Sequence, residues 1–133
     1  MDRPAPTSGL RHVALWVNDL EACEDFYVRI LGMEVEWRPD EENVYLTSGV
    51  DNLALHQART AIPSEAPEHL DHIGFIINDI EQVDEWYDYM KSEGVVIAKE
   101  LKTHRDGARS YYCKDPDGNV VQMIYHPPLA KID

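Results

Sequence analysis

The same pattern of apolar and polar residues occurs twice along the chain. Residues 70–81 repeat residues 10–21, with Leu, His, Asn, Asp and Glu at identical places and mostly apolar residues between them. In each copy a short run rich in branched and aromatic residues, 12–17 and 72–77, predicts a buried strand. The chain therefore contains an internal repeat that begins with a strand.

Each of these strands is expected to lead into a helix. Asn18 and Asn78 are placed to cap the helices, each with a glutamate three residues later that completes a capping box. Gly32 and Gly94 are placed to end them, because glycine adopts the left-handed conformation of a helix C-terminus without strain. Between cap and glycine, apolar residues recur at helical spacing: Leu20, Cys23, Tyr27, Ile30 and Leu31 in the first copy, and Ile80, Val83, Tyr87 and Met90 in the second.

Three further strands are expected after each helix. Turn sequences such as Asp106-Gly107 separate them. Their ranges are 35–38, 44–47, 53–57, 95–101, 108–113 and 120–125. Both halves therefore have the order βαβββ, an α+β arrangement. We expect one domain over residues 1–133, made of the modules 9–57 and 70–126 and joined by a proline-containing linker, 58–69.

The amino-acid composition disfavours some classes of binding partner. The chain has 133 residues, with 12 Lys and Arg against 25 Asp and Glu, which gives a net charge of −13. So acidic a chain is not expected to bind nucleic acid or anionic membrane surfaces. No apolar run approaches the roughly 20 residues that span a bilayer, and residues 1–9 lack the apolar core of a signal peptide. With only two cysteines, both expected to be reduced, the sequence predicts a cytoplasmic protein.

Two tandem βαβββ modules, a histidine early in each first strand, and the closing turn Asp115-Pro116-Asp117-Gly118-Asn119 resemble the vicinal oxygen chelate (VOC) superfamily. This superfamily includes glyoxalase I, extradiol dioxygenases, methylmalonyl-CoA epimerase, and the fosfomycin- and bleomycin-resistance proteins. The resemblance covers residues 10–126 and implies the glyoxalase/bleomycin-resistance/dioxygenase fold, in which the modules form a cup-shaped curved sheet. It also implies a homodimer with a small-molecule substrate.

Strand alternation places the candidate side chains on one face of each sheet. The more apolar faces are expected to pack under the helices, which leaves the mixed faces to line the concave side. The residues on these mixed faces are His12, Ala14 and Trp16 in the first strand, His72, Gly74 and Ile76 in the fifth, and Val120, Gln122 and Ile124 in the last.

The resemblance carries three metal-ligand positions onto His12, His72 and Gln122. Two imidazoles and one oxygen donor suit an open site for a divalent metal ion. Dioxygenases and fosfomycin-resistance proteins have a glutamate where Gln122 offers a neutral amide oxygen, so weaker metal binding is expected. These residues do not distinguish Fe(II), Mn(II), Ni(II) and Zn(II). Two hydrogen-bonded histidines beside an empty pocket are the alternative.

The resemblance also implies catalytic roles. In extradiol dioxygenases a second-sphere histidine and a tyrosine lie at nearly the positions of His56 and Tyr112. His56 would then shuttle a proton, and Tyr112 would hydrogen-bond a substrate oxygen. Trp16 and Ile76 would supply an apolar wall for a ring.

A second interpretation uses the sequence just before Tyr112. Arg109 and Ser110 fit the dioxygenase strand that precedes the final turn, and they also resemble the run with which fosfomycin-resistance proteins grip a phosphonate. His104 and Arg105 flank the preceding hairpin turn and are expected to be solvated.

Three functions follow from the resemblance. The first choice is a metal-dependent enzyme acting on a substrate with adjacent oxygens, with extradiol ring cleavage preferred. The second is a lyase or isomerase of the glyoxalase I kind. The third is a metal-free protein of the bleomycin-resistance type that sequesters an aromatic or cationic ligand, which the acidic charge and Trp16, Trp37, Tyr45 and Tyr112 would favour.

Overall fold

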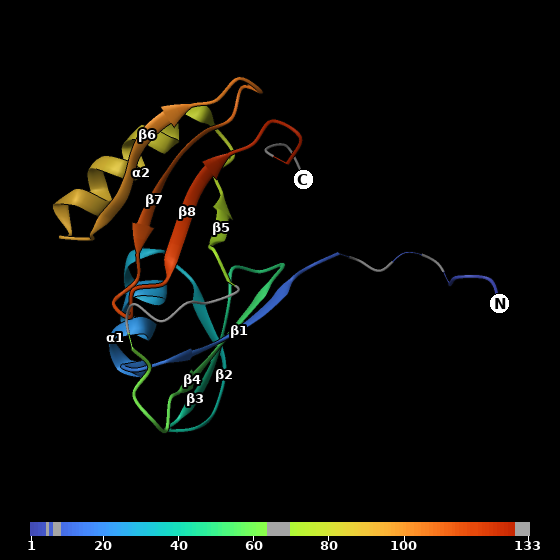
Figure 1. The fold of residues 1–133 in the computed structure, drawn as a ribbon, viewed down its shortest axis with the longest axis vertical. Coiled ribbons are helices and arrows are strands. Elements are labelled where there is room, and N and C mark those ends of the chain that lie inside the picture. The colour runs from blue at the N-terminus through green and yellow to red at the C-terminus, as the bar shows by residue number, and fades with distance from the viewer. Residues whose placement is uncertain (5, 7–8, 64–69, 130–133) are drawn as a thin grey trace. The chain divides into compact units, whose positions relative to one another are not determined.

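The computed structural model describes residues 1–4, 6, 9–63 and 70–129 (Figure 1). The chain divides into two compact units, Met1–Ala61 and Ile62–Asp133. Each unit has the expected βαβββ order, so the sequence repeat corresponds to a structural repeat. Of the expected linker, residues 64–69 lie outside the described residues. That the two units make one domain stays a prediction.

The first unit is a four-stranded sheet in the order β1-β4-β3-β2. Strand β1 runs parallel to β4, and the other neighbours are antiparallel. Its elements are β1 (His12–Val17), α1 (Leu20–Asp25), the π-helical turn η1 (Phe26–Ile30), β2 (Glu34–Asp40), β3 (Asn43–Thr47) and β4 (Asn52–Gln57).

The helix of the first unit begins one residue later than expected. Asp19, rather than Asn18, is the N-cap, and its side chain accepts a hydrogen bond from the backbone N–H of Ala22 at 3.0 Å. The helix continues through the π-helical turn to Ile30, with Leu31 as the C-cap, and is followed by Gly32, whose φ of 82° lies in the left-handed region. Its inner face buries Leu20, Cys23, Phe26, Tyr27 and Ile30 against Val17, Val44, Leu46, Leu53 and Leu55 of the sheet.

The second unit repeats this arrangement with the order β5-β8-β7-β6. Strand β5 is parallel to β8. Its elements are β5 (Ile73–Ile76), α2 (Ile80–Ser92), β6 (Ile97–Thr103), β7 (Arg109–Lys114) and β8 (Val120–Tyr125). Asp79, not Asn78, is the N-cap of α2, and its side chain makes no capping hydrogen bond. His72 lies one residue before β5.

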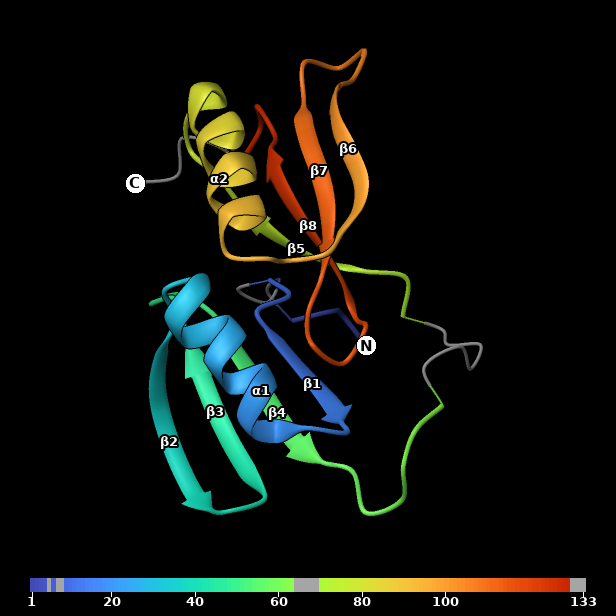
Figure 2. The same ribbon diagram turned by 90° about the vertical axis from the view of Figure 1, so that its left-hand side faces the viewer.

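Each helix packs on one face of the sheet in its own unit (Figure 2). Leu15 and Val17 are buried under α1 side chains, while Trp16 between them is 61% exposed. In the second unit Tyr87 of α2 meets Tyr111 of β7 edge to face, with ring centroids 5.1 Å apart. The expected division into a helix-covered face and a second face is therefore confirmed in both units, and we call the second the helix-free face.

No helix among the described residues is long and apolar enough to cross a membrane.

Candidate functional site

The helix-free face of the first unit carries a row of rings that crosses all four strands. Trp16 of β1 lies 5.4 Å from His56 of β4, centroid to centroid, and His56 lies 6.1 Å from Tyr45 of β3. Tyr45 stacks on Trp37 of β2 at 5.2 Å. The row is accessible at both ends, since Trp16 is 61% and Trp37 is 58% exposed. We call these four residues the ring row.

His12 lies on the same face and is held by a chain of two hydrogen bonds. Its Nδ1 is 2.7 Å from Oδ1 of Asn52, and the amide nitrogen of Asn52 donates to Glu36 at 2.9 Å. Because the nitrogen of the Asn52 amide donates to Glu36, its oxygen faces the histidine. The Asn52 oxygen therefore accepts from Nδ1–H of His12, and the lone pair on Nε2 is left for another partner.

His72 of the second unit is oriented in the same way but directly by a carboxylate. Its Nδ1 lies 2.7 Å from Oδ2 of Asp71, and its ring meets Tyr112 edge to face at 5.2 Å. A histidine that donates Nδ1–H to a carboxylate has the tautomer and orientation typical of metal-ligating histidines. The arrangement again leaves Nε2 available.

Gln122 occupies the middle of the helix-free face in the second unit. Its neighbours in the sheet are Gly74 of β5 and Tyr112 of β7. The Gln122 side-chain oxygen lies 3.9 Å from the position that a Cβ on Gly74 would take, so the missing side chain leaves the amide accessible from the strand edge. Gln122 is half-buried.

The donor chemistry of these three residues fits a divalent metal ion. Two imidazole Nε2 atoms and an amide oxygen suit several of the first-row metals. No three His, Cys, Asp or Glu side chains gather into a metal site within the described part of the chain. Because His12 belongs to one unit and His72 and Gln122 to the other, their joint coordination of one ion stays a prediction.

His56 and Tyr112 also lie on the helix-free faces. The Nδ1 of His56 is 2.5 Å from Oδ1 of Asn43. Tyr112 is half-buried, between the His72 ring and the ammonium group of Lys99, which lies 5.2 Å from the Tyr112 ring centroid. Ile76, the expected apolar wall residue of β5, is 44% exposed.

Ser110 and Arg109 point to opposite sides of β7. Ser110 is 1% exposed, and its hydroxyl lies 3.1 Å from Nε2 of His104, which is part-buried rather than solvated as expected. The guanidinium of Arg109 instead donates to Asp84 of α2 at 2.7 Å and to Thr103 at 2.8 Å. Adjacent strand residues alternate between faces, so Arg109 secures the helix and does not lie beside Ser110. That Arg109 also contacts the substrate stays a prediction.

Two lysines of β6 add positive charge near Tyr112 and Ser110. Lys99 is the register partner of Tyr112, and Lys102 is the register partner of Ser110. Neither lysine forms an ion pair with a described carboxylate. In a chain with a net charge of −13, these are two cations without a carboxylate partner among the described residues.

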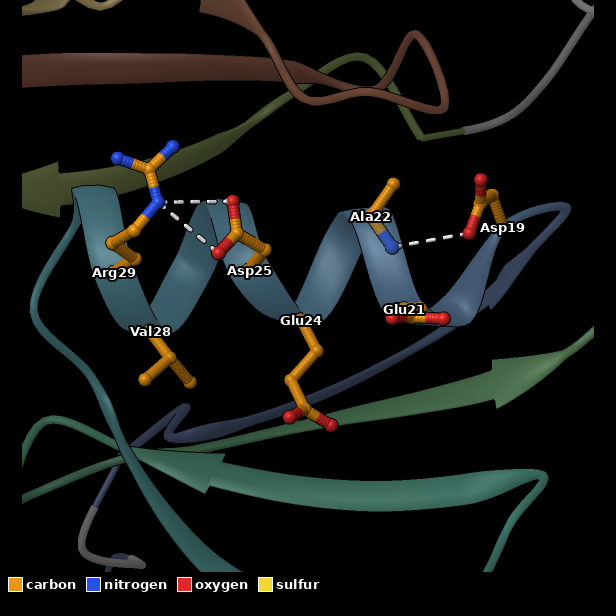
Figure 3. A pocket seen from close by; sticks show the side chains of 7 residues that line it. All are labelled: Asp19, Glu21, Ala22, Glu24, Asp25, Val28 and Arg29. Atoms are coloured by element: carbon orange, nitrogen blue, oxygen red, sulfur yellow. Dashed lines mark hydrogen bonds and ion pairs between the residues drawn. The ribbon is translucent and has the colours of Figure 1, made fainter.

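One surface hollow of the described residues has no counterpart among the predicted site residues. It measures about 560 Å³, and all of its lining side chains come from α1, its N-cap and η1 (Figure 3). The Asp25–Arg29 ion pair, whose two residues line this hollow, joins exposed side chains and so contributes little to stability. Another hollow, about 130 Å³ in volume, is lined by Asp71, Ala98, Lys99, Tyr112 and Val120. It adjoins the His72 environment, which makes it the more relevant of the two to chemistry.

The hydrogen-bond partners of the histidines could not be read from the repeat. Asn52 shares a face with His56 by strand alternation, but its contact with His12 depends on the parallel β1–β4 register. Asn43 reaches His56 through the β3–β4 register. In the sequence, these two asparagines are visible only as polar residues at the ends of predicted strands.

Known proteins share the fold and are similar in sequence over most of this chain. A family model for the Glyoxalase/Bleomycin resistance protein/Dioxygenase superfamily matches residues 9–123. Metallothiol transferase FosB of Staphylococcus epidermidis is 28% identical over 116 residues, which cover 87% of this chain and 80% of that protein. An uncharacterised protein of Pseudomonas aeruginosa is 30% identical over 130 residues, with 91% of each chain covered.

Solved structures agree on the architecture. Lactoylglutathione lyase from Agrobacterium tumefaciens superposes with a TM-score of 0.76 at 24% identity, covering 96% of this chain and 100% of that one. TioX from Micromonospora sp. ML1 gives 0.69 at 20% identity, with 90% and 99% covered.

Paired βαβββ units with a histidine at the start of each define a protein of the vicinal oxygen chelate type. The chain belongs to the Glyoxalase/Bleomycin resistance protein/Dioxygenase superfamily, as its sequence predicts.

Proposed function

We propose that the protein is a metal-dependent enzyme that acts on a small substrate with adjacent oxygen atoms. His12, His72 and Gln122 would hold a divalent metal ion through the two Nε2 atoms and the amide oxygen. One observation carries this proposal: both histidines donate Nδ1–H to an oxygen acceptor, through Asn52 to Glu36 in one case and to Asp71 in the other. Such outer-sphere partners hold a ligating imidazole in the tautomer that a metal needs.

The bound ion would polarise the substrate oxygens as a Lewis acid. The residues of the chain account for the remaining tasks. Tyr112 would hydrogen-bond a substrate oxygen, since it adjoins both His72 and Gln122 within its sheet. His56 would take up a proton, and Trp16 and Ile76 would contact the apolar part of the substrate.

Metal content tests the proposal directly. Protein purified without chelator or affinity tag is expected to retain a divalent metal, and His12→Ala and His72→Ala are expected to lose it. His126→Ala is the matched control, because it removes an imidazole that lies outside the set. Substoichiometric metal that is the same in all four proteins would contradict the proposal.

Extradiol cleavage of a catechol remains the preferred reaction within this class. It is supported by His56 and Tyr112, which both lie on helix-free faces with neighbouring aromatic rings. Oxygen consumption with a panel of catechols, after anaerobic loading with Fe(II), tests it. Absence of uptake, together with Ni(II)- or Zn(II)-dependent turnover of a hemithioacetal, would favour the glyoxalase-type lyase instead.

Group transfer to an anionic substrate is a second candidate. It is supported by Lys99 and Lys102, which have no described carboxylate partner, by the buried Ser110 beside His104, and by the similarity to metallothiol transferases. Consumption of a thiol in the presence of fosfomycin and Mn(II) tests this candidate. Lys102→Met is expected to raise KM, whereas no dependence on Lys99 or Lys102 would count against it.

The metal-free binding protein is distinguished by a chelator. Quenching of tryptophan fluorescence by an aromatic ligand reports on the ring row, because Trp16 and Trp37 are its exposed ends. Equal affinity with and without EDTA would favour sequestration, and affinity lost with the metal would favour the enzyme. We also propose that the protein is a cytoplasmic homodimer, which its molar mass in solution and its cellular fractionation test.

A further inference from the structure

His56 sits at the end of a second hydrogen-bond chain, separate from the one that holds His12. Its Nδ1 lies 2.5 Å from the side-chain oxygen of Asn43, and the amide nitrogen of Asn43 donates to Asp40 at 2.8 Å. Asp40 and Asn43 are paired across the end of the β2–β3 hairpin. Three polar side chains, one each from β2, β3 and β4, are thus joined in series by hydrogen bonds.

The hydrogen-bond chain ends at the carboxylate of Asp40, which accepts two hydrogen bonds. The same Asp40 oxygen that receives the Asn43 amide also accepts the backbone N–H of Glu42 at 2.8 Å. These two hydrogen bonds, with the backbone contribution first, hold the pKa of Asp40 below its ordinary value of 3.8, so the group is ionised near neutrality.

The carboxylate determines the tautomer of the histidine two steps away. Because an ionised Asp40 only accepts, the nitrogen of the Asn43 amide must face it and the oxygen must face His56. An oxygen facing Nδ1 at 2.5 Å requires the proton on Nδ1. The unprotonated nitrogen of neutral His56 is therefore Nε2.

The neighbouring rings restrict the orientation of His56. Trp16 lies on one side with its ring plane tilted by 52°, and Tyr45 lies on the other, edge to face at 82°. His56 is half-buried in this position on the helix-free face. A half-buried ring between two aromatic side chains, with one nitrogen committed to Asn43, has one nitrogen left to meet a ligand.

We propose that Asn43 is a positioning residue that holds His56 as the Nδ1–H tautomer and so directs the Nε2 lone pair to a hydroxyl group of the bound substrate. In the step this allows, the O–H bond of the substrate breaks, its electron pair stays on oxygen, and Nε2 becomes protonated. The resulting imidazolium keeps its Nδ1–H bond to Asn43. The catalytic part rests on the proposed function, whereas the tautomer does not.

Nitrogen-15 NMR of the imidazole rings tests the tautomer in metal-free protein without substrate, at a pH well above the ordinary range of histidine titration. The His56 signals are assigned by their loss in His56→Gln. Wild-type His56 is expected to carry its proton on Nδ1. In Asn43→Leu the ratio of Nδ1–H to Nε2–H should fall by roughly five- to tenfold, the equivalent of one lost hydrogen bond.

Three further variants separate positioning from general damage. Asn52→Leu removes the corresponding amide from the hydrogen-bond chain that holds His12. It should change the NMR signals of His12 but not those of His56. The double variant Asp40→Asn/Asn43→Asp exchanges the two groups and should retain the Nδ1–H form, because a carboxylate then accepts directly from His56. If Asn43→Leu does not fold, Asp40→Ala should also lower the Nδ1–H fraction, since the Asn43 amide is then free to turn.

Kinetics then test the catalytic consequence. With a substrate that the enzyme turns over, Asn43→Leu should lower kcat about tenfold at nearly constant KM, and the exchanged double variant should recover most of it. A wild-type proton on Nε2, or a ratio unchanged in Asn43→Leu and Asp40→Ala, overturns the positioning role. A normal tautomer with no catalysis of any tested reaction refutes the proposed function alone.

Discussion

Replacement of Arg109 by methionine distinguishes a structural from a substrate-binding role for that residue. Its guanidinium donates to Asp84 at 2.7 Å and to Thr103 at 2.8 Å, so it ties α2 to β6 and β7. The Arg109 side chain is 23% exposed, but Asp84 is 55% exposed, so the ion pair is discounted for solvent screening. We expect a coupling of about 0.5–1 kcal/mol with Asp84 and a similar amount for the Thr103 hydrogen bond.

The methionine retains part of the packing of the arginine stem, so the net loss is about 1 kcal/mol of unfolding free energy. For a chain of this size, a loss of that magnitude lowers Tm by about 3–6 °C. A double-mutant cycle of Arg109→Met and Asp84→Ala, measured by urea denaturation, isolates the ion pair. Steady-state kinetics on the same variants should give unchanged KM values.

Two results would refute this reasoning. A coupling energy of zero in the cycle would mean that the ion pair does not hold the helix. A large rise in KM for an anionic substrate, with stability unchanged, would restore Arg109 to the substrate site. Lys102→Met is the comparison, since it removes a cation from the opposite face of the same sheet and should leave Tm nearly unchanged.

Four further measurements examine other features. Gln122→Glu should bind metal at least tenfold more tightly in competition with a chelator, because it adds a negative charge to the ligand set; weaker binding would exclude it as a ligand. Asp19→Ala should cost about 1 kcal/mol in urea denaturation, whereas Asp79→Ala should cost much less, because only Asp19 makes a capping hydrogen bond. Burial first, and then the nearby Asp115, raises the pKa of Cys113 from 9.0 to about 12. The folded chain should therefore resist thiol reagents at pH 8, and its stability should fall as the pH rises above about 9, where the unfolded thiol ionises; rapid labelling without unfolding would contradict the burial.

Much of the fold was predictable because the repeat and strand alternation are local signals. The strands at 12–17 and 120–125 agree with β1 and β8, and the separation of Leu15 and Val17 from Trp16 follows from a period of two. The helix starts were displaced by one residue. Asn and Asp are nearly equal as N-caps, so sequence preference does not decide between adjacent candidates.

The environment of the candidate site depended on contacts distant in sequence. The partner of Arg109 is on α2, and that of His104 is across a hairpin, so neither contact is visible from the residues on either side. The Asn43 and Asn52 contacts required the strand registers of β4 with β3 and β1. The candidate site residues were taken from the family resemblance and their functional roles stay predictions, whereas their hydrogen-bond partners required coordinates.

The parallel pairing of the first strand of each unit with its last has a consequence for biosynthesis. His12 of β1 pairs with Asn52 of β4, so the first sheet cannot close until β4 has left the ribosome. The second sheet likewise requires β8, the last strand of the described residues, which ends at Tyr125. During translation all four strands of the first unit therefore emerge before β8 does, and a premature stop before β8 would leave β5 without the strand that it pairs with.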